Sequence, residues 1–309
     1  MKRLFYFVLL LVGVSTIHSC KDLLDEDGNP LLDINNNSGL NGPRALYREI
    51  TDSDTLATYY YNGLQLNRVI TDSASVTNIA WSGDKISRVD FKGFLDLNND
   101  GDLEKDSIVY TQQFTYGNTG KLETISENRS FFKRTTVPPS PIPGPQTLYK
   151  KTKSLYKIIY DGATAKLDSI IMRNGPDAPG NPAFTDYSKT KYQYVGDNVS
   201  SVIRHYGPMN GSGVFGAPVT KYAYNFSNYD AKISPFTLVP TGYRISRLLS
   251  TEINDAESWI LSPNSPKRFS ITDLTLPVPA PEIFSTDYNY DPQTYMTKGY
   301  GVNYIYKPL

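Results

Sequence analysis

The fold prediction rests on the stretch KYQYVGDNVSSV, residues 191–202. Tyr192 and Tyr194 alternate with polar residues, and alternation at period two places both rings on one face of a β-strand. The Gly-Asp pair that follows is typical of a tight turn, and two apolar residues, Val199 and Val202, come directly after it. The stretch therefore predicts a β-hairpin.

The same unit recurs along the chain. Aromatic segments meet turn residues at 59–63, 81–84, 114–120 and 158–162, and weaker copies begin at Tyr222 and Tyr288. Each of the four stronger copies continues with two apolar residues three positions apart. These pairs are Leu66 and Val69, Ile86 and Val89, Leu122 and Ile125, and Leu167 and Ile170. An offset of three either places the pair on opposite faces of the strand or indicates a β-bulge near the turn.

This unit, an aromatic segment with Tyr-Asp/Asn-Gly followed by Leu-x-x-Ile, resembles the YD-type hairpin repeats of Rhs-like proteins. It is still more similar to the repeat lipoproteins of the Bacteroidota, and the similarity spans most of residues 55–305. The resemblance implies an all-β fold, an extended antiparallel meander of hairpin repeats that forms one curved sheet. Hairpins that cannot bury their own apolar faces must stack on their neighbours.

The rest of the composition agrees with an all-β domain over residues 46–309. The chain has 24 tyrosines, 22 glycines and 21 prolines, and long helical periodicity is scarce. Pro-rich stretches at 137–145 and 276–281 interrupt the repeat, and proline cannot donate to a strand ladder. Either stretch could mark a domain boundary. Because the repeat resumes after each, we expect loop insertions in one domain.

The N-terminus has the pattern of an export signal. Lys2 and Arg3 precede an apolar run at 4–14, which is too short to span a bilayer but fits the core of a signal peptide. Residues 17–20, Ile-His-Ser-Cys, resemble the lipobox of bacterial lipoproteins. We expect residues 1–19 to be a lipoprotein signal peptide and Cys20 to be the lipid attachment site. The alternative is a plain secretory signal with an incidental cysteine.

Cys20 is the only cysteine among the 309 residues, so the chain forms no internal disulfide. Two acyl chains on Cys20 would anchor the protein stably to a membrane. Residues 21–27, KDLLDED, resemble the Lys-then-acidic signal that sends Bacteroidota lipoproteins to the cell surface; the alternative is a solvated acidic tail. We expect an outer-membrane lipoprotein displayed at the cell surface, with the periplasmic face as the alternative, and residues 20–45 as a flexible acidic and Asn-Gly tether.

One loop has the spacing of calcium ligands. Oxygen-bearing side chains stand at positions 1, 3 and 5 of residues 96–107, and Gly101 at position 6 permits a sharp turn. The loop resembles EF-hand-like loops of the dockerin kind, although Ser107 stands where they have a closing acid. The possible ligands of a structural calcium ion are Asp96, Asn98, Asp100, Asp102 and Asp106. The alternative is an Asx-rich hairpin loop between strands ending near Phe94 and starting near Ile108.

Catalytic constellations are sparse. His205 is the only histidine after the signal peptide, so several histidine ligands for zinc are impossible within one mature chain, and a Ser-His-Asp triad would depend on His205 alone. We expect it to be an exposed strand residue instead. We therefore assign no catalytic residue and no organic cofactor. With 31 basic and 31 acidic residues the net charge is zero, so the sequence lacks the excess of basic residues that is typical of nucleic-acid-binding proteins.

These observations favour a non-enzymatic binding or scaffolding module of the cell envelope, with a glycan or an envelope protein as its ligand. A carboxylate-based glycan hydrolase is the alternative, because it needs only two acids at the right separation. A third possibility is that the protein is a component of outer-membrane assembly.

Overall fold

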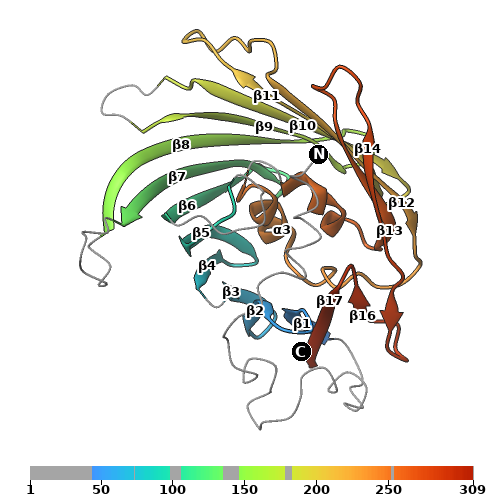
Figure 1. Ribbon diagram of the computed structural model, residues 1–309. Helices are drawn as coiled ribbons and strands as arrows, with labels where there is room; N and C mark the ends of the chain where they lie inside the picture. Colours follow the sequence, from blue (N-terminus) through green and yellow to red (C-terminus); the bar gives the residue numbers. More distant parts are fainter. Residues whose placement is uncertain are drawn as a thin grey trace, which may run out of the picture.

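The computed structural model describes residues 44–308, apart from residue 73 and residues 98–105, 135–145, 178–182 and 252–253. Its main feature is one curved sheet of 17 strands (Figure 1). The strands are β1 (Arg44–Ile50), β2 (Thr55–Asn62), β3 (Gln65–Thr71), β4 (Ser75–Ser82), β5 (Lys85–Gly93), β6 (Ser107–Tyr116), β7 (Leu122–Arg134), β8 (Gln146–Tyr160), β9 (Leu167–Pro176), β10 (Asp186–Val195), β11 (Asn198–Pro208), β12 (Thr220–Tyr229), β13 (Pro266–Asp273), β14 (Pro281–Ser285), β15 (Asn289–Tyr290), β16 (Met296–Gly299) and β17 (Val302–Pro308).

The sheet is an antiparallel meander from β1 to β14 in which each strand pairs with the next. The chain then returns through β15 and β16 to β17, which pairs with β1. Strands β14 and β15 are the two edges, so the sheet stays open between them. The all-β meander prediction is confirmed. The Pro-rich stretch 276–281 leads into β14, the edge strand where proline is tolerated.

A β-bulge in each of the five strong hairpins explains the offset of three between the apolar residues. In the hairpin of β6 and β7, Tyr116 pairs with Leu122 and Thr115 pairs with Thr124, so Glu123 is the extra residue. The extra residue turns Leu122 to the same face as Ile125, and both side chains are buried. The other four strong copies have a register shift at the equivalent place. Of the two alternatives that the sequence left open, the bulge is correct.

Neighbouring hairpins are linked near these bulges. The indole of Trp81 donates to the carbonyl of Leu66 at 2.8 Å, and the hydroxyl of Tyr116 donates to the carbonyl of Ile86 at 2.9 Å. Each acceptor is the first of the two apolar residues that follow the turn of the preceding hairpin. The lysine after a turn also covers the aromatic ring of the next hairpin, as Lys121 does with Tyr160 at 4.9 Å. Equivalent cation–π contacts join Lys85 to Tyr116 and Lys166 to Tyr194. These links show physically how one hairpin adds to the next.

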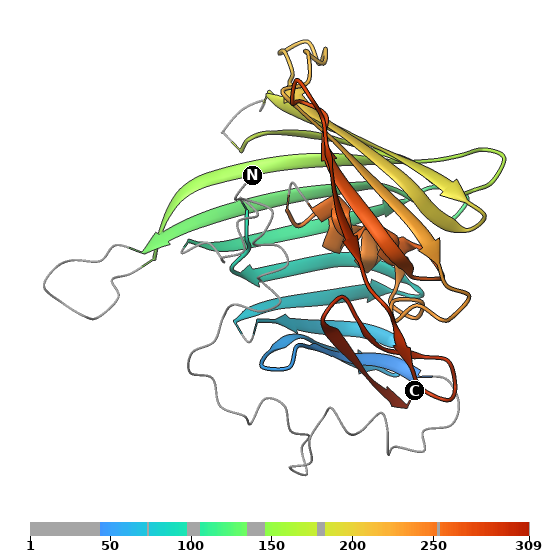
Figure 2. The ribbon, with the colours of Figure 1, turned by 45° about the vertical axis from the view of Figure 1, so that its right-hand side comes forward.

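Two short helices fill the concave side of the sheet, which the sequence reasoning did not predict. Helix α3 (Thr241–Leu248) begins after Pro240, whose fixed φ suits the start of a helix. The 3₁₀ helix η2 (Asn254–Leu261) follows it, and both lie between β12 and β13. Figure 2 shows them enclosed by the curved sheet. Buried side chains of both helices, including Tyr243, Leu248 and Ile260, belong to the main core.

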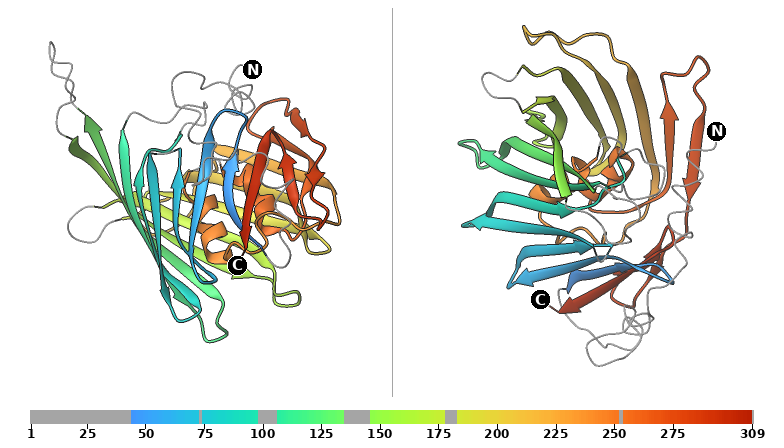
Figure 3. Two further views of the ribbon diagram at one scale, coloured as in Figure 1. Left: turned by 90° about the horizontal axis from the view of Figure 1, so that it is seen from below. Right: turned by 60° about the vertical axis from the view of Figure 1, so that its left-hand side comes forward.

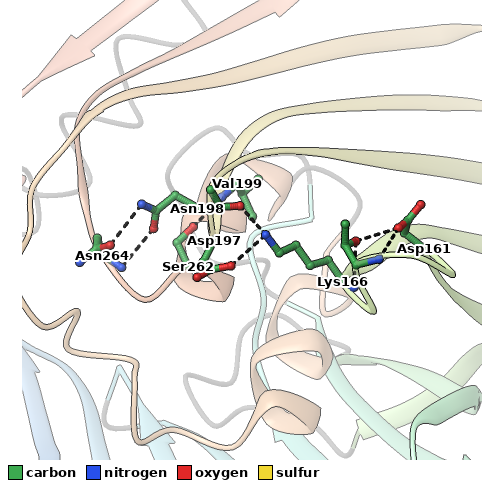
Figure 4. Close-up of polar contacts among 9 residues, drawn as sticks. Asp161, Lys166, Asp197, Asn198, Val199, Ser262 and Asn264 are labelled. Atoms are coloured by element: carbon green, nitrogen blue, oxygen red, sulfur yellow. Dashed lines mark hydrogen bonds and ion pairs between the residues drawn. The ribbon is translucent and has the colours of Figure 1, made fainter.

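Polar contacts fix the segment after η2 to the turn between β10 and β11 (Figure 4). The backbone amide of Val199 donates to Ser262 at 2.9 Å, and the side chains of Asn198 and Asn264 contact each other at 3.2 Å. On the other side of the same turn, Lys166 forms a 2.8 Å ion pair with Asp197. The helical insertion is therefore held by a repeat turn as well as by the core.

The N-terminal predictions lie outside the described residues. These are the signal peptide at 1–19, Cys20 and the tether up to residue 43, and the Pro-rich stretch 137–145 is likewise not described. Arg44 and Ala45, the last two residues of the expected tether, belong to β1 and are buried.

Candidate functional site

A cavity of about 420 Å³ lies between the helical insertion and the strands around it. Its lining residues belong to β1–β6 on one side, to β13, β14 and β17 on the other, and to α3 and η2. Figure 3 shows these strands curving around the two helices. We call the cavity between them the aromatic cavity. Ring-bearing side chains make up much of its wall, namely Phe91, Phe94, Tyr110, Phe236, Tyr243, Trp259, Phe269, Phe284, Tyr300 and Tyr304. Apolar walls with a few convergent polar groups, in a volume of 300–1,000 Å³, are typical of small-molecule sites.

Arg247 of α3 organises the charged part of the aromatic cavity. Its guanidinium bonds both oxygens of Glu257 at 2.9 and 3.0 Å and one oxygen of Glu49 at 2.8 Å. It also donates to the hydroxyl of Tyr59, which in turn donates to Glu49. Burial alone would lower the pKa of Arg247, but the carboxylates of Glu257 and Glu49 raise it well above its ordinary value. The guanidinium is thus a permanent, pre-positioned cation with about a quarter of its side chain accessible.

Asp72 is a second ionisable group on the cavity wall. Burial, followed by the negative charge of Glu49, raises the pKa of Asp72 from 3.8 to about 6, although Arg247 opposes this rise. The residue follows β3 with a positive φ of 49°. Aspartate is one of the few residues besides glycine that adopts this conformation readily. A carboxyl that titrates near pH 6 can donate a hydrogen bond below that pH and only accept one above it.

A second cavity of about 300 Å³ lies on the inner face of β7–β11. Its charged groups already have partners: Arg129 pairs with Glu127 at 3.0 Å and Arg204 pairs with Asp255 at 3.2 Å. Glu127 also accepts a hydrogen bond from Gln112, which itself accepts one from Ser246 of α3. We read these groups as the polar contacts that attach the helical insertion to the sheet. The aromatic cavity is therefore the stronger candidate for a ligand site.

The structure places two of the five expected calcium ligands. Asp96 follows β5 and lies on the wall of the aromatic cavity, and Asp106 stands directly before β6. Asn98, Asp100 and Asp102 lie outside the described residues. Strands end at Gly93 and start at Ser107, close to the limits expected for the loop. Within the described part of the chain no three His, Cys, Asp or Glu side chains come together as metal ligands.

His205 lies on β11 and is half-buried instead of exposed. Partial burial and then the neighbouring charges of Lys221 and Lys189 lower its pKa.

The residues that form the aromatic cavity were missed at the sequence level. Arg247 and Trp259 belong to the insertion between β12 and β13, and Glu49 and Asp72 stand in or beside short strands 23 residues apart in sequence. One signal was present: the repeat stops after Tyr229 and resumes only at Pro266, and that gap includes Trp259. No spacing rule connects these positions, because the curvature of the sheet brings them together.

In the segments that the structure describes, no helix combines the length and the apolar character needed to cross a membrane. No protein-family model matches the sequence, and no curated protein matches it either. The solved structures that match include two described as porin-like proteins. The one from Bacteroides vulgatus is 11% identical, with 86% of this chain and 100% of that chain covered and a TM-score of 0.46. The one from Bacteroides uniformis is 12% identical, with 72% and 96% covered and a TM-score of 0.26. Similarity at this level assigns no function to this chain. The function is therefore inferred from the side chains of the chain itself.

Proposed function

We propose that the protein is a non-enzymatic lipoprotein of the cell envelope that binds a saccharide in the aromatic cavity. The observation that supports this proposal is the combination of accessible rings, such as Tyr300 and Phe284, with the charged cluster of Arg247, Glu257 and Asp72 in one volume. Aromatic faces pack against the apolar faces of sugar rings, and charged side chains form strong hydrogen bonds to hydroxyl groups.

The arrangement favours binding over glycoside hydrolysis. A hydrolase needs one carboxylate that is free to act as nucleophile or base. Glu49 accepts hydrogen bonds from both Tyr59 and Arg247, and Arg247 holds both oxygens of Glu257. These two carboxylates are engaged as positioning groups. Asp72 and Asp96 also line the cavity. In this proposal Asp96 is a ligand of the calcium loop, which leaves Asp72 without a second carboxylate for the pair.

Binding to a glycan panel tests the proposal. We expect the wild-type chain to bind a defined subset of saccharides and Phe94→Ala, which removes a half-buried ring from the cavity wall, to weaken binding about tenfold. Tyr60→Ala is the matched control, because Tyr60 is 40% exposed and does not line the cavity. Equal loss in both variants, or binding that neither variant changes, would contradict the cavity as the site.

The lipid anchor is part of the proposal and has its own test. A thioether-linked diacylglycerol on Cys20 would hold the sheet at the outer membrane, with residues 21–43 as the spacer. We expect the wild-type chain to incorporate labelled fatty acid and to sediment with membranes, and Cys20→Ser to do neither. Surface display predicts that protease added to intact cells degrades the protein; protection of the protein would place it on the periplasmic face.

Calcium is the third part of the proposal. An ion held by the 96–106 loop would lie beside the cavity, because Asp96 lines the wall. We expect chelation to reduce saccharide affinity and the pair Asp100→Asn with Asp102→Asn to remove the calcium response. Unchanged binding in the presence of a chelator would remove calcium from the proposal and leave the cavity in place.

A further inference from the structure

The convex face of the sheet has a strongly uneven charge. Seven basic side chains point outward from β8, β9, β10 and β12, and we call this set the basic face. Its members are Lys151, Lys153, Lys157, Arg173, Lys189, Lys191 and Lys221. Their neighbours along the strands, including Tyr156, Ile158 and Tyr192, are in the core on the concave side, so alternation directs the basic side chains outward.

Acidic residues do not balance this face. Strands β8–β12 are described in full and contain two acids, Asp168 and Asp186. Asp168 pairs with Lys191; among the described residues, no other member of the basic face forms an ion pair. Since the whole chain has zero net charge, the positive potential belongs to this face and does not reflect an overall excess.

Three of the lysines lie in one straight row across the strands. Lys157 is paired in register with Ile171, Ile171 with Lys189, Lys189 with His205, and His205 with Lys221. A lysine therefore stands on every second strand. With neighbouring strands about 4.8 Å apart, the lysines repeat at about 10 Å along a line perpendicular to the strands.

We propose that the basic face binds an acidic polysaccharide that lies across β8–β12 along the row Lys157–Lys189–Lys221. A regular series of cations suits a polymer whose acidic groups repeat regularly. The outward groups on the same face include hydroxyls and amides, such as Ser126, Ser201 and Asn225, which suit hydrogen bonds to sugar hydroxyls. They also include apolar side chains, such as Ile171 and Ile203. The face is also convex, with the helices on its opposite side (Figures 1 and 2). A flexible polymer follows such a curve, whereas a flat lipid surface touches it only along a line.

His205 provides a local probe of the same row. It lies between Lys189 and Lys221, and partial burial, followed by the charges of Lys221 and Lys189, lowers its pKa. A polyanion that neutralises the two lysines would remove part of that effect. The pKa of His205 is therefore expected to rise on binding, and NMR titration of the full-length chain measures it. The chain has two histidines, so His205→Gln assigns the resonance.

The decisive experiment compares two triple variants with equal loss of charge. Lys157→Gln with Lys189→Gln and Lys221→Gln removes the row; Lys92→Gln with Lys232→Gln and Lys267→Gln removes three lysines elsewhere. The probes are polygalacturonate and a heparin oligosaccharide, with neutral dextran, phosphatidylglycerol vesicles and duplex DNA as comparisons. We expect the wild type and the second triple to bind the acidic polysaccharides in a salt-sensitive manner, and the row triple to bind about tenfold more weakly.

Several results would overturn the inference. Equal losses in the two triples would show a non-specific charge effect, and equal or tighter binding to vesicles or DNA would assign the face to a membrane or a nucleic acid. Absence of binding to both acidic probes, or a His205 pKa that does not change at saturation, would also refute it. The result does not depend on the aromatic cavity, because Phe94→Ala leaves the basic face intact.

Discussion

Replacement of Asp72 by asparagine gives the sharpest test of the electrostatics of the aromatic cavity. In the folded chain the pKa of Asp72 is raised from 3.8 to about 6, mainly by burial. The folded state therefore holds this proton more tightly than the unfolded state does. The stability that this tighter proton binding gives to the folded state is fully present below pH 3.8 and is lost as the pH rises through 6. At about 1.4 kcal/mol for each unit of pKa, the difference corresponds to at most about 3 kcal/mol.

Asp72→Asn keeps the size of the side chain and tolerates the φ of 49°, but it cannot ionise. We expect it to be about as stable as the wild type at pH 4 and about 1 kcal/mol more stable at pH 7.5, well below the upper bound, because the side chain of Asp72 is exposed and solvent screens its charge. Urea denaturation at pH 4, 5, 6 and 7.5, followed by tryptophan fluorescence, measures the difference between the two chains. Asp84→Asn, in the exposed turn between β4 and β5, controls for the loss of one negative charge. A difference that does not change with pH, or a variant less stable at pH 7.5, would refute the reasoning.

Three further variants test the packing, each by urea denaturation. Deletion of Glu123 removes the bulge and leaves Leu122 two positions before Ile125, so both side chains stay on the inner face of a regular strand, and we expect a loss of no more than about 1 kcal/mol; a loss above about 3 kcal/mol would mean that the deletion has turned Leu122 outward. Tyr116→Phe removes a hydrogen bond to the preceding hairpin and should cost about 1 kcal/mol; no cost would count against the proposed linkage between repeats. Arg247→Met leaves two carboxylates without their shared cation and should cost about 3–5 kcal/mol, whereas a neutral result would show that the cluster is solvated.

The repeat made most of the fold predictable from sequence. Tyrosine alternation and Gly-containing turns predict hairpins because both act locally, and the two-residue turn at Gly196 has the positive φ of 56° that favours glycine. The pairs at 66 and 69 or 199 and 202 also contained the evidence for a bulge. Only the register of the paired strands could decide between a bulge and opposite faces.

The helical insertion was not predictable in the same way. Helix α3 is eight residues long, too short for apolar periodicity to stand out, and it forms because Tyr243, Ile245 and Leu248 are buried against a sheet built from distant strands. The charged cluster of the aromatic cavity also depends on the packing of this helix against the sheet. Arg247 meets Glu49 across 198 residues of sequence, and the sheet must curve before the two can touch. By contrast, the pattern of a possible calcium loop could be recognised in the sequence because its candidate ligands lie within 11 residues, yet only the structure places Asp96 at the cavity wall.

The central claim is that a saccharide occupies the aromatic cavity, and fluorescence of Trp259 tests it most directly. The chain has two tryptophans, so Trp81→Phe leaves Trp259, on the cavity wall, as the sole reporter. With the best ligand from the glycan panel, we predict a saturable change in Trp259 emission that Phe94→Ala weakens about tenfold in the same background. Saturable binding that leaves Trp259 emission unchanged, at an affinity that Phe94→Ala does not alter, would contradict the account.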